Sequence, residues 1–347
     1  MNPAVMKAGL ETLYYTGAYR ALAPIARGRG IIFMMHQVSR GAPPDFSPNY
    51  GLHLSPEFLG AAVKRIRARG FEIVSMDEAL VRLASEDAAP FAVLTFDDGY
   101  RDNLKLAYPT LKALDCPFTV YVATALPDGS AELWWHAIED VIATQDDIAF
   151  ARDGGAERLP CRTIAEKAAA FQTLHEWLWW ADEDRQRAFV RDLAQRYGVS
   201  LKALCERQAM SWEEVRELAA DPIVTIGAHT VGHYALAKLD AARARAEIED
   251  GAKALEAALG ARPEHLAYPY GDPRAAGPRE FEIAKELGFA SAVTTRKGLL
   301  FNAHRAHVHA LPRVALNGDY QSLRYVDLYL SGAPFAIFNK FRRLNVA

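Results

Sequence analysis

The sequence predicts an α/β protein, a distorted (β/α) barrel with about seven parallel strands and a helical insertion. Two patterns lead to this prediction. Short apolar runs rich in β-branched residues alternate with amphipathic stretches, which is typical of parallel strands joined by helices. The alternation then stops between about residues 126 and 212, where every recognisable element looks helical. A chain of 347 residues has room for one barrel that carries such an insertion.

The expected strands are short runs in which β-branched and aromatic residues are enriched. They are Ile31–Met35, Ala92–Phe96, Phe118–Ala123, Val224–Ala228, Leu266–Tyr268 and Ser291–Thr294. Another strand is expected to end near Arg313, in the segment Leu-Pro-Arg-Val. The expected helices between the strands are Pro56–Arg69, Tyr108–Leu114, Ala241–Leu259 and Glu280–Leu287. The third of these is followed by Gly260 and then Pro263, a combination that stops helices.

The insertion is expected to consist of helices without any strand. These helices are predicted at Glu132–Thr144, Ile164–Ala181, Asp182–Tyr197 and Ser211–Ala219. The insertion also contains all six tryptophans of the chain, which are Trp134, Trp135, Trp177, Trp179, Trp180 and Trp212. Three of them share one predicted helix and cannot all face the same way, so we expect most of them to form the core of the insertion.

The chain is expected to form a single main domain with a short segment at each end. The main domain is predicted at 31–330, an N-terminal helical segment at 1–30 and an amphipathic tail at 331–347. Both ends mix aromatic with basic side chains. Each end therefore fits either a helix packed on the fold or a segment that rests on a membrane surface.

Composition excludes some classes of partner and favours one compartment. The chain has 40 Lys and Arg against 43 Asp and Glu, a net charge of −3, which gives no reason to expect nucleic acid as a partner. Cys116, Cys161 and Cys205 are odd in number and widely spaced, as expected of buried thiols in a reducing compartment. No signal peptide is recognisable, so we expect a cytoplasmic location, with the ends suited to the inner membrane face.

Two acidic residues stand where an expected strand ends. Asp97 and Asp98 follow the run Ala92–Phe96 and precede Gly99. Neighbouring side chains point to opposite faces while a strand continues, but a turn at glycine allows both carboxylates to reach one pocket. Polar residues at the carboxyl ends of barrel strands are typical of active sites, although Asp-Asp-Gly is also an ordinary polar turn.

Two histidines follow another expected strand in the same way. His229 comes directly after Val224–Ala228, and His233 is four residues further on. If this segment turns into a helix, positions i and i+4 lie on one face and can share a metal ion, with Thr230 bracing the turn through its hydroxyl group. Two imidazoles and a carboxylate suit a divalent transition metal such as zinc.

Together these segments resemble the NodB-homology polysaccharide deacetylases of carbohydrate esterase family four. The three motifs of that family are present in order, as Thr-Phe-Asp-Asp-Gly at Thr95–Gly99, His-Thr-x-x-His at His229–His233 and Pro-Tyr-Gly at Pro269–Gly271. The opening Met-His-Gln-Val around His36 is similar to that of the biofilm poly-N-acetylglucosamine deacetylases, a branch whose motif order is permuted.

The resemblance implies a role for each matching position. Asp98, His229 and His233 would hold a divalent metal ion, with zinc as the first choice. Asp97 would act as the general base, and the backbone N–H of Tyr270 would stabilise the oxyanion. Three protein ligands leave a position open for water, as in catalytic rather than structural zinc sites.

The general acid is less clearly marked in the sequence. In most members of the family, the histidine that acts as the general acid lies in a late motif. This chain has His304, His307 and His309 just before Leu-Pro-Arg-Val. In the biofilm branch the early histidine carries this role, which here is His36. We favour His36, and His307 or His309 remains the alternative.

Two further residues are expected near the site. Many members carry an arginine that orients the base shortly before Pro-Tyr-Gly, but here Arg262 is followed directly by Pro263. Arg313 would supply the same charge from another strand end and hold Asp97 ionised. Of the tryptophans, Trp135 is the one that we favour for contact with a sugar.

The resemblance implies a hydrolase that removes acetyl from an N-acetylated sugar and releases acetate. The partner would be a glycan: a polysaccharide, an oligosaccharide or a lipid-linked intermediate. Two alternatives stay open, since fold and metal site do not fix the substrate. They are an amidohydrolase of a non-sugar amide and a non-catalytic carbohydrate-binding relative, although a pure binder has no need of a base such as Asp97.

Overall fold

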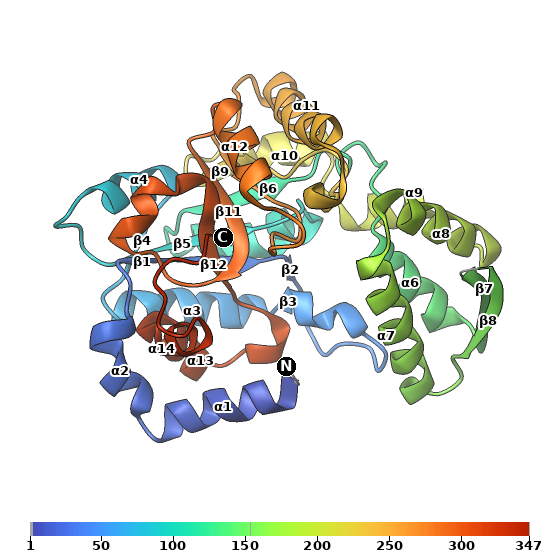
Figure 1. The fold of residues 1–347 in the computed structure, drawn as a ribbon, viewed down its shortest axis with the longest axis horizontal. Coiled ribbons are helices and arrows are strands. Elements are labelled where there is room, and N and C mark those ends of the chain that lie inside the picture. Colours follow the sequence, from blue (N-terminus) through green and yellow to red (C-terminus); the bar gives the residue numbers. More distant parts are fainter. Residues whose placement is uncertain (1–2, 153, 347) are drawn as a thin grey trace.

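A closed ring of parallel strands forms the centre of the protein. The computed structural model describes residues 3–152 and 154–346. Seven strands pair side by side in the order β1-β12-β11-β10-β9-β6-β5, and β5 pairs back with β1 to close the ring (Figure 1). Their bounds are β1 Gly30–Met35, β5 Phe91–Phe96, β6 Phe118–Val122, β9 Val224–Ala228, β10 His265–Ala267, β11 Ser291–Lys297 and β12 Leu311–Ala315. The predicted distorted barrel of about seven strands is confirmed.

The ring is irregular beside β5. The short strand β4 (Glu72–Ile73) pairs with the first residues of β5, while β6 pairs with its last residues. All six residues of β5 are buried, because one face of the strand points into the barrel and the other lies under helices. The apolar run that predicts this strand therefore shows no alternation.

Helices cover the outside of the ring. They are α3 Pro56–Ala68, α4 Met76–Ala84, α5 Tyr108–Lys112, α10 Trp212–Ala219, α11 Ala241–Leu259, α12 Pro278–Glu286 and α13 Leu323–Ser331. Ser55 starts α3 by accepting a hydrogen bond from the Phe58 N–H, and the apolar side of this helix is buried against the barrel. Gly260 ends α11 in the left-handed conformation, as its sequence predicts.

The remaining elements of the barrel are short. They are β2 Gln37–Val38, β3 His53–Leu54, the π-helical turn η2 Asn103–Ala107 and the 3₁₀ turns η1 Pro48–Leu52, η3 Leu236–Lys238, η4 Asn302–Ala306, η5 Val308–Ala310 and η6 Gly318–Tyr320. Strands β2 and β3 form a small parallel pair of their own, apart from the ring.

The insertion forms a separate lobe with its own apolar core, on the right in Figure 1. It contains α6 Trp134–Thr144, β7 Asp147–Arg152, β8 Gly155–Pro160, α7 Ile164–Trp180, α8 Glu183–Arg196 and α9 Leu201–Gln208. The prediction of a purely helical insertion is wrong, because β7 and β8 form an antiparallel hairpin. Ile148 and Phe150 alternate inward along β7, a period-two signal too short to stand out between helices.

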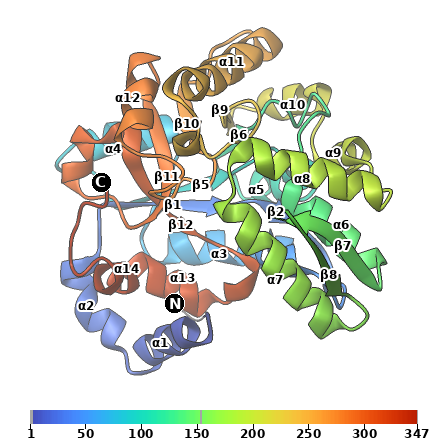
Figure 2. The same cartoon turned by 45° about the vertical axis from the view of Figure 1, so that its right-hand side comes forward.

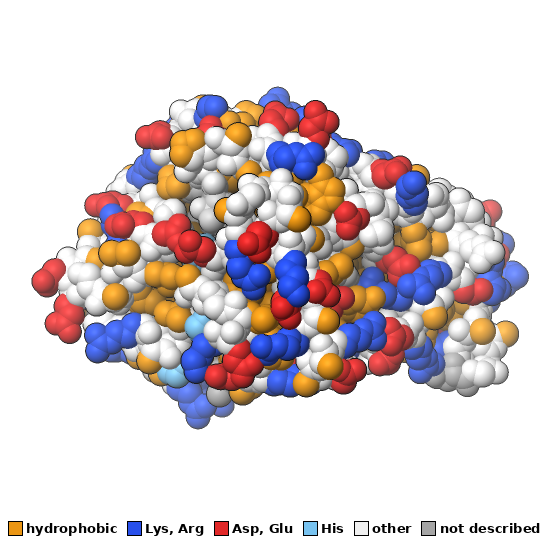
Figure 3. Space-filling model, turned by 90° about the horizontal axis from the view of Figure 1, so that it is seen from above, with side chains coloured by type: hydrophobic (Ala, Val, Ile, Leu, Met, Phe, Trp, Pro, Cys, Tyr) orange, Lys and Arg blue, Asp and Glu red, His pale blue; other side chains and the backbone are white. Residues whose placement is uncertain are grey.

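Both ends of the described chain pack on the fold. Helices α1 (Pro3–Tyr15) and α2 (Ala18–Ala26) lie against α13, and α14 (Ala333–Phe338) lies against α2 (Figures 1 and 2). Among the described residues, no helix is both long and apolar enough to cross a membrane. On the face seen in Figure 3, basic and acidic side chains are intermixed, in keeping with the nearly balanced composition.

Candidate active site

The carboxyl ends of the strands bring the predicted motifs together. Asp97 and Asp98 follow β5, and His229 follows β9. Each loop continues its strand pairing for one residue, because the Asp97 N–H donates to the Met35 carbonyl at 3.0 Å and the His229 N–H donates to the Val122 carbonyl at 3.1 Å. The backbone that carries the candidate site is therefore fixed by the barrel itself.

Asp98, His229 and His233 form one cluster of metal-binding atoms. The Oδ1 atom of Asp98 lies 3.3 Å from Nε2 of His229 and 3.2 Å from Nε2 of His233, and the three ligand atoms lie within 4.8 Å of one another. All three residues are buried. The structure therefore brings together the three residues for which the sequence predicts metal binding.

The arrangement of the three side chains favours a bound cation. Oδ1 of Asp98 is buried yet has no hydrogen-bond partner among the described residues. A buried, unpaired carboxylate oxygen is costly, and a divalent cation between the three side chains removes that cost. Two imidazole nitrogens and one carboxylate oxygen form a ligand set that zinc accepts, as do cobalt, nickel and iron.

The orientation of His229 is set by a hydrogen bond on the far side of its ring. Its Nδ1 lies 2.7 Å from the carbonyl oxygen of Ala267 and donates to it, since a carbonyl only accepts. Nε2 then carries the lone pair and faces Asp98. Metal-binding histidines are commonly oriented by such a bond to a backbone carbonyl.

His233 reaches the cluster through a strained loop and not through a helix. Residues 229–235 are not helical, and Thr230 and His233 adopt positive φ angles of 67° and 56°. The helical turn that would bring positions i and i+4 together is therefore absent, and the positive φ angles of the loop bring the two histidines to one cluster instead. The predicted brace by Thr230 is confirmed, since its Oγ1 accepts the His233 N–H at 3.2 Å.

Helix α11 supports this loop from behind. One carboxylate oxygen of Glu247 accepts the N–H groups of Val231 at 3.2 Å and Gly232 at 2.8 Å. A Cβ atom on Gly251 would lie 2.7 Å from the Thr230 carbonyl, so the helix approaches the loop as closely as glycine allows. No sequence motif marks Glu247, because its role depends on a contact between elements distant in the chain.

Backbone strain is concentrated at the site. Asp98, Thr230, His233 and Tyr270 are four of the seven non-glycine residues with positive φ in the described part of the chain. Gly99 follows Asp98 with φ of 93°, which provides the turn expected after β5. Such residues persist where the surrounding structure holds them, and they are enriched at functional sites.

Asp97 is held by a buried arginine from the last strand of the ring. Arg313 donates to both carboxylate oxygens, from Nη1 to Oδ1 at 2.7 Å and from Nη2 to Oδ2 at 2.6 Å. Its other donors reach the Thr294 carbonyl and the Thr95 hydroxyl group. The predicted contact between Arg313 and Asp97 is therefore present, and it is bidentate.

Positive neighbours keep both carboxylates ionised in spite of burial. Burial raises the pKa of Asp97, but the charge and hydrogen bonds of Arg313, together with His229 and His36 in their protonated forms, outweigh burial, so the pKa of Asp97 is lowered. Burial likewise raises the pKa of Asp98, and the two histidines, when protonated, lower it well below its usual value. Both carboxylates are therefore available as anions, one to accept a proton and one to hold a cation.

The candidate acids lie at opposite ends of the barrel. His36 follows β1 at the carboxyl end, and in its protonated form it lowers the pKa of both Asp97 and Asp98. His307 and His309 precede β12 and therefore lie at the amino end, where Nε2 of His309 donates to the Phe289 carbonyl at 2.7 Å. Only His36 shares the end of the barrel that carries the cluster.

Tyr270 forms one wall of the site. Within the described residues its backbone N–H has no protein acceptor, and its ring centroid lies 4.8 Å from that of His233. Its hydroxyl group accepts a hydrogen bond from Nε1 of Trp134 at 2.8 Å. The predicted oxyanion donor therefore stands beside the cluster with its N–H available.

Two aromatic residues of the site come from outside the motifs. The ring centroid of Trp135 lies 5.3 Å from that of His233, and its Nε1 donates to the Tyr100 hydroxyl group at 3.2 Å. Trp135 is the tryptophan favoured above for sugar contact, whereas Tyr100 was not predicted. The position of Tyr100 directly after Asp-Asp-Gly is the sequence signal that could have identified it.

The chemistry that these groups can perform is hydrolysis. A three-ligand cluster leaves room for water, a paired carboxylate beside it can accept a proton, and a backbone N–H can stabilise an oxyanion. A histidine at the same end of the barrel can donate a proton to a leaving group.

Comparison with protein families agrees with this chemistry. A sequence profile described as polysaccharide deacetylase matches residues 84–149 and 179–292, just over half of the chain. No curated protein matches the chain by sequence at a significant level. The match covers Asp97, Asp98, His229, His233 and Tyr270. His36 and Arg313 lie outside the matched residues.

Solved structures of low sequence identity share the fold. Deacetylase PplD of Streptococcus pyogenes, in complex with acetate, is 18% identical with a TM-score of 0.55 over 83% of this chain and 92% of its own. IcaB from Ammonifex degensii is 18% identical with a TM-score of 0.54 over 88% and 97%. A de-N-acetylase from Aggregatibacter actinomycetemcomitans is 14% identical with a TM-score of 0.54 over 86% and 99%.

Proposed function

Because this chain belongs to the polysaccharide deacetylase family, we propose that it is a metal-dependent enzyme that removes acetyl from an N-acetylated sugar unit of a glycan. The family makes it a hydrolase of carbon–nitrogen bonds with polysaccharide as its substrate class. The observation that carries the proposal is the buried cluster of Asp98, His229 and His233 beside the Asp97–Arg313 ion pair.

In this proposal Asp98, His229 and His233 hold the metal, and zinc is the first choice. A divalent metal held there would act as a Lewis acid toward the acetamide carbonyl and lower the pKa of water.

The residues around the cluster carry the remaining catalytic roles. Asp97 accepts the proton of the attacking water, and Arg313 keeps that carboxylate ionised and aims its oxygens. The N–H of Tyr270 donates to the oxyanion as the carbonyl carbon becomes tetrahedral. His36 donates a proton to the sugar nitrogen as the carbon–nitrogen bond breaks. Acetate and the free amine are the products.

Removal of the metal tests the proposal directly. Dialysis against a chelator is expected to abolish acetate release from N-acetylglucosamine oligomers, and added zinc is expected to restore it, because the cluster supplies every protein ligand of the metal. Acetate is measured by an enzymatic assay, and metal content by mass spectrometry. Full activity of metal-free protein would contradict the proposal. Turnover of small acetamides without turnover of sugars would reassign the substrate.

The role of His36 gives a second prediction. His36→Gln is expected to lower kcat by about 10²- to 10⁴-fold and to leave the bound metal unchanged, because a general acid acts in the transition state. His309→Gln is the matched control and is expected to keep full activity, since His309 lies at the other end of the barrel. Full activity of His36→Gln together with a large loss of activity in His309→Gln would instead assign the general acid to the late histidines.

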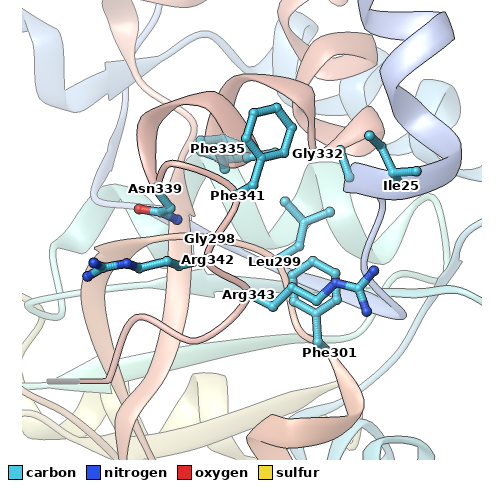
Figure 4. Close-up of a pocket in the computed structure, with 12 residues that line it drawn as sticks. Ile25, Gly298, Leu299, Phe301, Gly332, Phe335, Asn339, Phe341, Arg342 and Arg343 are labelled. Atoms are coloured by element: carbon cyan, nitrogen blue, oxygen red, sulfur yellow. The ribbon is translucent and has the colours of Figure 1, made fainter.

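The terminal elements suggest where the enzyme works. Ile25, Phe338 and Phe341 are 58%, 55% and 57% exposed, and all three lie near an end of the chain. Ile25 and Phe341 line a small pocket together with Arg342 and Arg343 (Figure 4). Exposed apolar groups beside basic ones are typical of peripheral contact with anionic lipid. We therefore propose a cytoplasmic enzyme that rests on the inner membrane face through its ends.

Vesicle binding tests this contact. The wild-type protein is expected to sediment with vesicles of phosphatidylglycerol and phosphatidylcholine, and Phe338→Ser/Phe341→Ser is expected to sediment several-fold less, because it loses buried apolar area at the interface. Val81→Ser is the matched control, since Val81 is 64% exposed on α4. Equal sedimentation of the three proteins would rule out the contact.

A further inference from the structure

The second histidine of the cluster has no hydrogen bond that orients its ring. Nδ1 of His229 donates to the Ala267 carbonyl, whereas Nδ1 of His233 is buried and has no hydrogen-bond partner among the described residues. Metal-binding histidines are usually oriented through the ring nitrogen that does not bind the metal. The direction of the His233 ring therefore depends on its backbone, which has a positive φ angle of 56°, and on the aromatic rings packed around it.

A buried arginine of the insertion holds the backbone at His233. Arg187 lies on α8, is 5% exposed, and donates from Nη2 to the Gly232 carbonyl at 2.7 Å. This carbonyl belongs to the peptide group that joins Gly232 to His233, and the N–H of the same group donates to Oγ1 of Thr230. The peptide group is therefore fixed at both of its ends, once by the loop itself and once by the insertion.

The same guanidinium group also packs on the residue after His233. It lies 4.0 Å from the ring centroid of Tyr234, a distance typical of a cation–π contact. The guanidinium group of Arg243, from α11, lies 4.8 Å from the same ring centroid. Arg187 therefore contacts the residues on both sides of His233.

Helix α8 is itself tied to the barrel at this point. Asp184, one turn before Arg187, forms a bidentate ion pair with Arg243 of α11, in which both N–O distances are 2.7 Å. Glu247 of the same barrel helix accepts two N–H groups of the loop. The backbone of the loop is therefore held by one charged side chain from the insertion and one from the barrel.

The shortest contact of Arg187 is with the loop and not with a counter-ion. Its closest ion pair among the described residues, with Oε2 of Glu132, measures 3.8 Å, compared with 2.7 Å to the Gly232 carbonyl. A buried charge without a close counter-ion contributes little to stability, and an apolar residue of similar volume often serves stability as well or better. The position of Arg187 is therefore better explained by the loop that it holds.

We infer that Arg187 is a positioning residue for the metal site, which holds the peptide group before His233 and so makes metal affinity depend on the insertion. The inference rests on the proposed function, because it takes the cluster as the metal site, and goes beyond it by giving the insertion a role in metal binding. Strained backbone persists only where its surroundings hold it, so loss of this bond lets the loop relax and turn His233 away from the other two ligands.

Zinc affinity, measured by competition with a chromogenic chelator, tests this role. Arg187→Met removes the donors and the charge but keeps much of the volume, and we expect it to bind zinc about 10- to 100-fold more weakly than the wild type, as when other partners of metal ligands are lost. Arg187→Lys keeps the charge and a donor, so its affinity is expected to lie between the two.

Arg191→Met is the matched control. Arg191 lies one turn further along α8, has a 59% exposed side chain and pairs with Glu132. It makes the same chemical change on the same helix, and we expect its zinc affinity to equal that of the wild type.

Cobalt(II) distinguishes a positioning role from a purely structural one. The visible absorption of cobalt(II) depends on the geometry of its ligands, so cobalt-saturated Arg187→Met is expected to differ from the wild type in band position or intensity. Urea unfolding of the metal-free proteins measures stability separately. If Arg187→Met does not fold, Arg187→Lys takes its place in both metal measurements, with a several-fold loss of zinc affinity expected.

The outcomes separate this inference from the proposed function. If the wild type binds zinc and releases acetate but the Arg187 variant keeps its zinc affinity within about twofold, or has an unchanged cobalt spectrum at saturation, the inference is overturned and the function stands. If the wild type binds zinc without releasing acetate from any sugar, the proposed function fails, and weaker zinc binding by the variant still supports the inference. A wild-type protein that binds no zinc would overturn both.

Discussion

Replacing Asp98 by asparagine is expected to remove both bound metal and deacetylase activity. The substitution exchanges the only anionic ligand of the cluster for a neutral amide while it preserves the shape of the side chain. Metal affinity is expected to fall by more than the roughly 10- to 100-fold that changes in outer-shell partners cause. Metal content by mass spectrometry and acetate release by an enzymatic assay measure the two losses on the same samples.

Asp97→Asn is the matched control for this prediction. It changes the neighbouring carboxylate in the same way, but Asp97 faces Arg313 and is no member of the cluster. We expect it to keep its metal and to lose about 10²- to 10⁴-fold in kcat, the usual contribution of a general base. If both variants lose metal equally, or if Asp98→Asn keeps full metal content and activity, the assignment of the two carboxylates is wrong.

Replacing Arg313 by methionine is expected to cause the largest loss of stability. The side chain of Arg313 is fully buried, and its loss would leave the Asp97 carboxylate buried without a counter-charge. Removing one partner of a buried ion pair costs about 3 to 5 kcal/mol of unfolding free energy. Urea unfolding monitored by circular dichroism measures the loss, and activity is expected to fall with it because Asp97 loses its orientation.

A double-mutant cycle distinguishes the lost ion pair from lost packing. Asp97→Asn/Arg313→Met removes the stranded charge, so we expect it to be more stable than Arg313→Met alone. If the double variant is destabilised by the sum of the two single changes, Arg313 contributes packing and not charge compensation. We expect both variants to have lost most of their activity in either case, so stability is the deciding measurement.

The sequence predicted the residues whose position depends on strand ends. Asp98 and His229 each follow an apolar run, and parallel strands of a barrel deliver such residues to one end. Arg313 was expected near Asp97 for the same reason, although the two residues are 216 positions apart. The principal helices were predicted from their periodicity and the strands from short apolar, β-branched runs, and both signals can be read locally in the sequence.

The errors have a common physical origin in contacts between distant parts of the chain. For the loop from His229 to His233 a helical turn was considered, but the shape of the loop depends on Glu247 and Gly251 of α11. The β7–β8 hairpin was missed because its alternation is short and lies among helices.

The ion pair between Asp97 and Arg313 has a consequence for the synthesis and folding of the protein. Arg313 belongs to β12, which is inserted between β11 and β1 and is the last strand of the ring to be synthesised. Until β12 docks, the carboxylate has no partner and the pocket around it is open to water. A nascent chain, or one truncated before residue 313, has all three sequence motifs but lacks the arginine that pairs with Asp97. Under the proposed role of Asp97, such incomplete chains are expected to be inactive until the barrel closes.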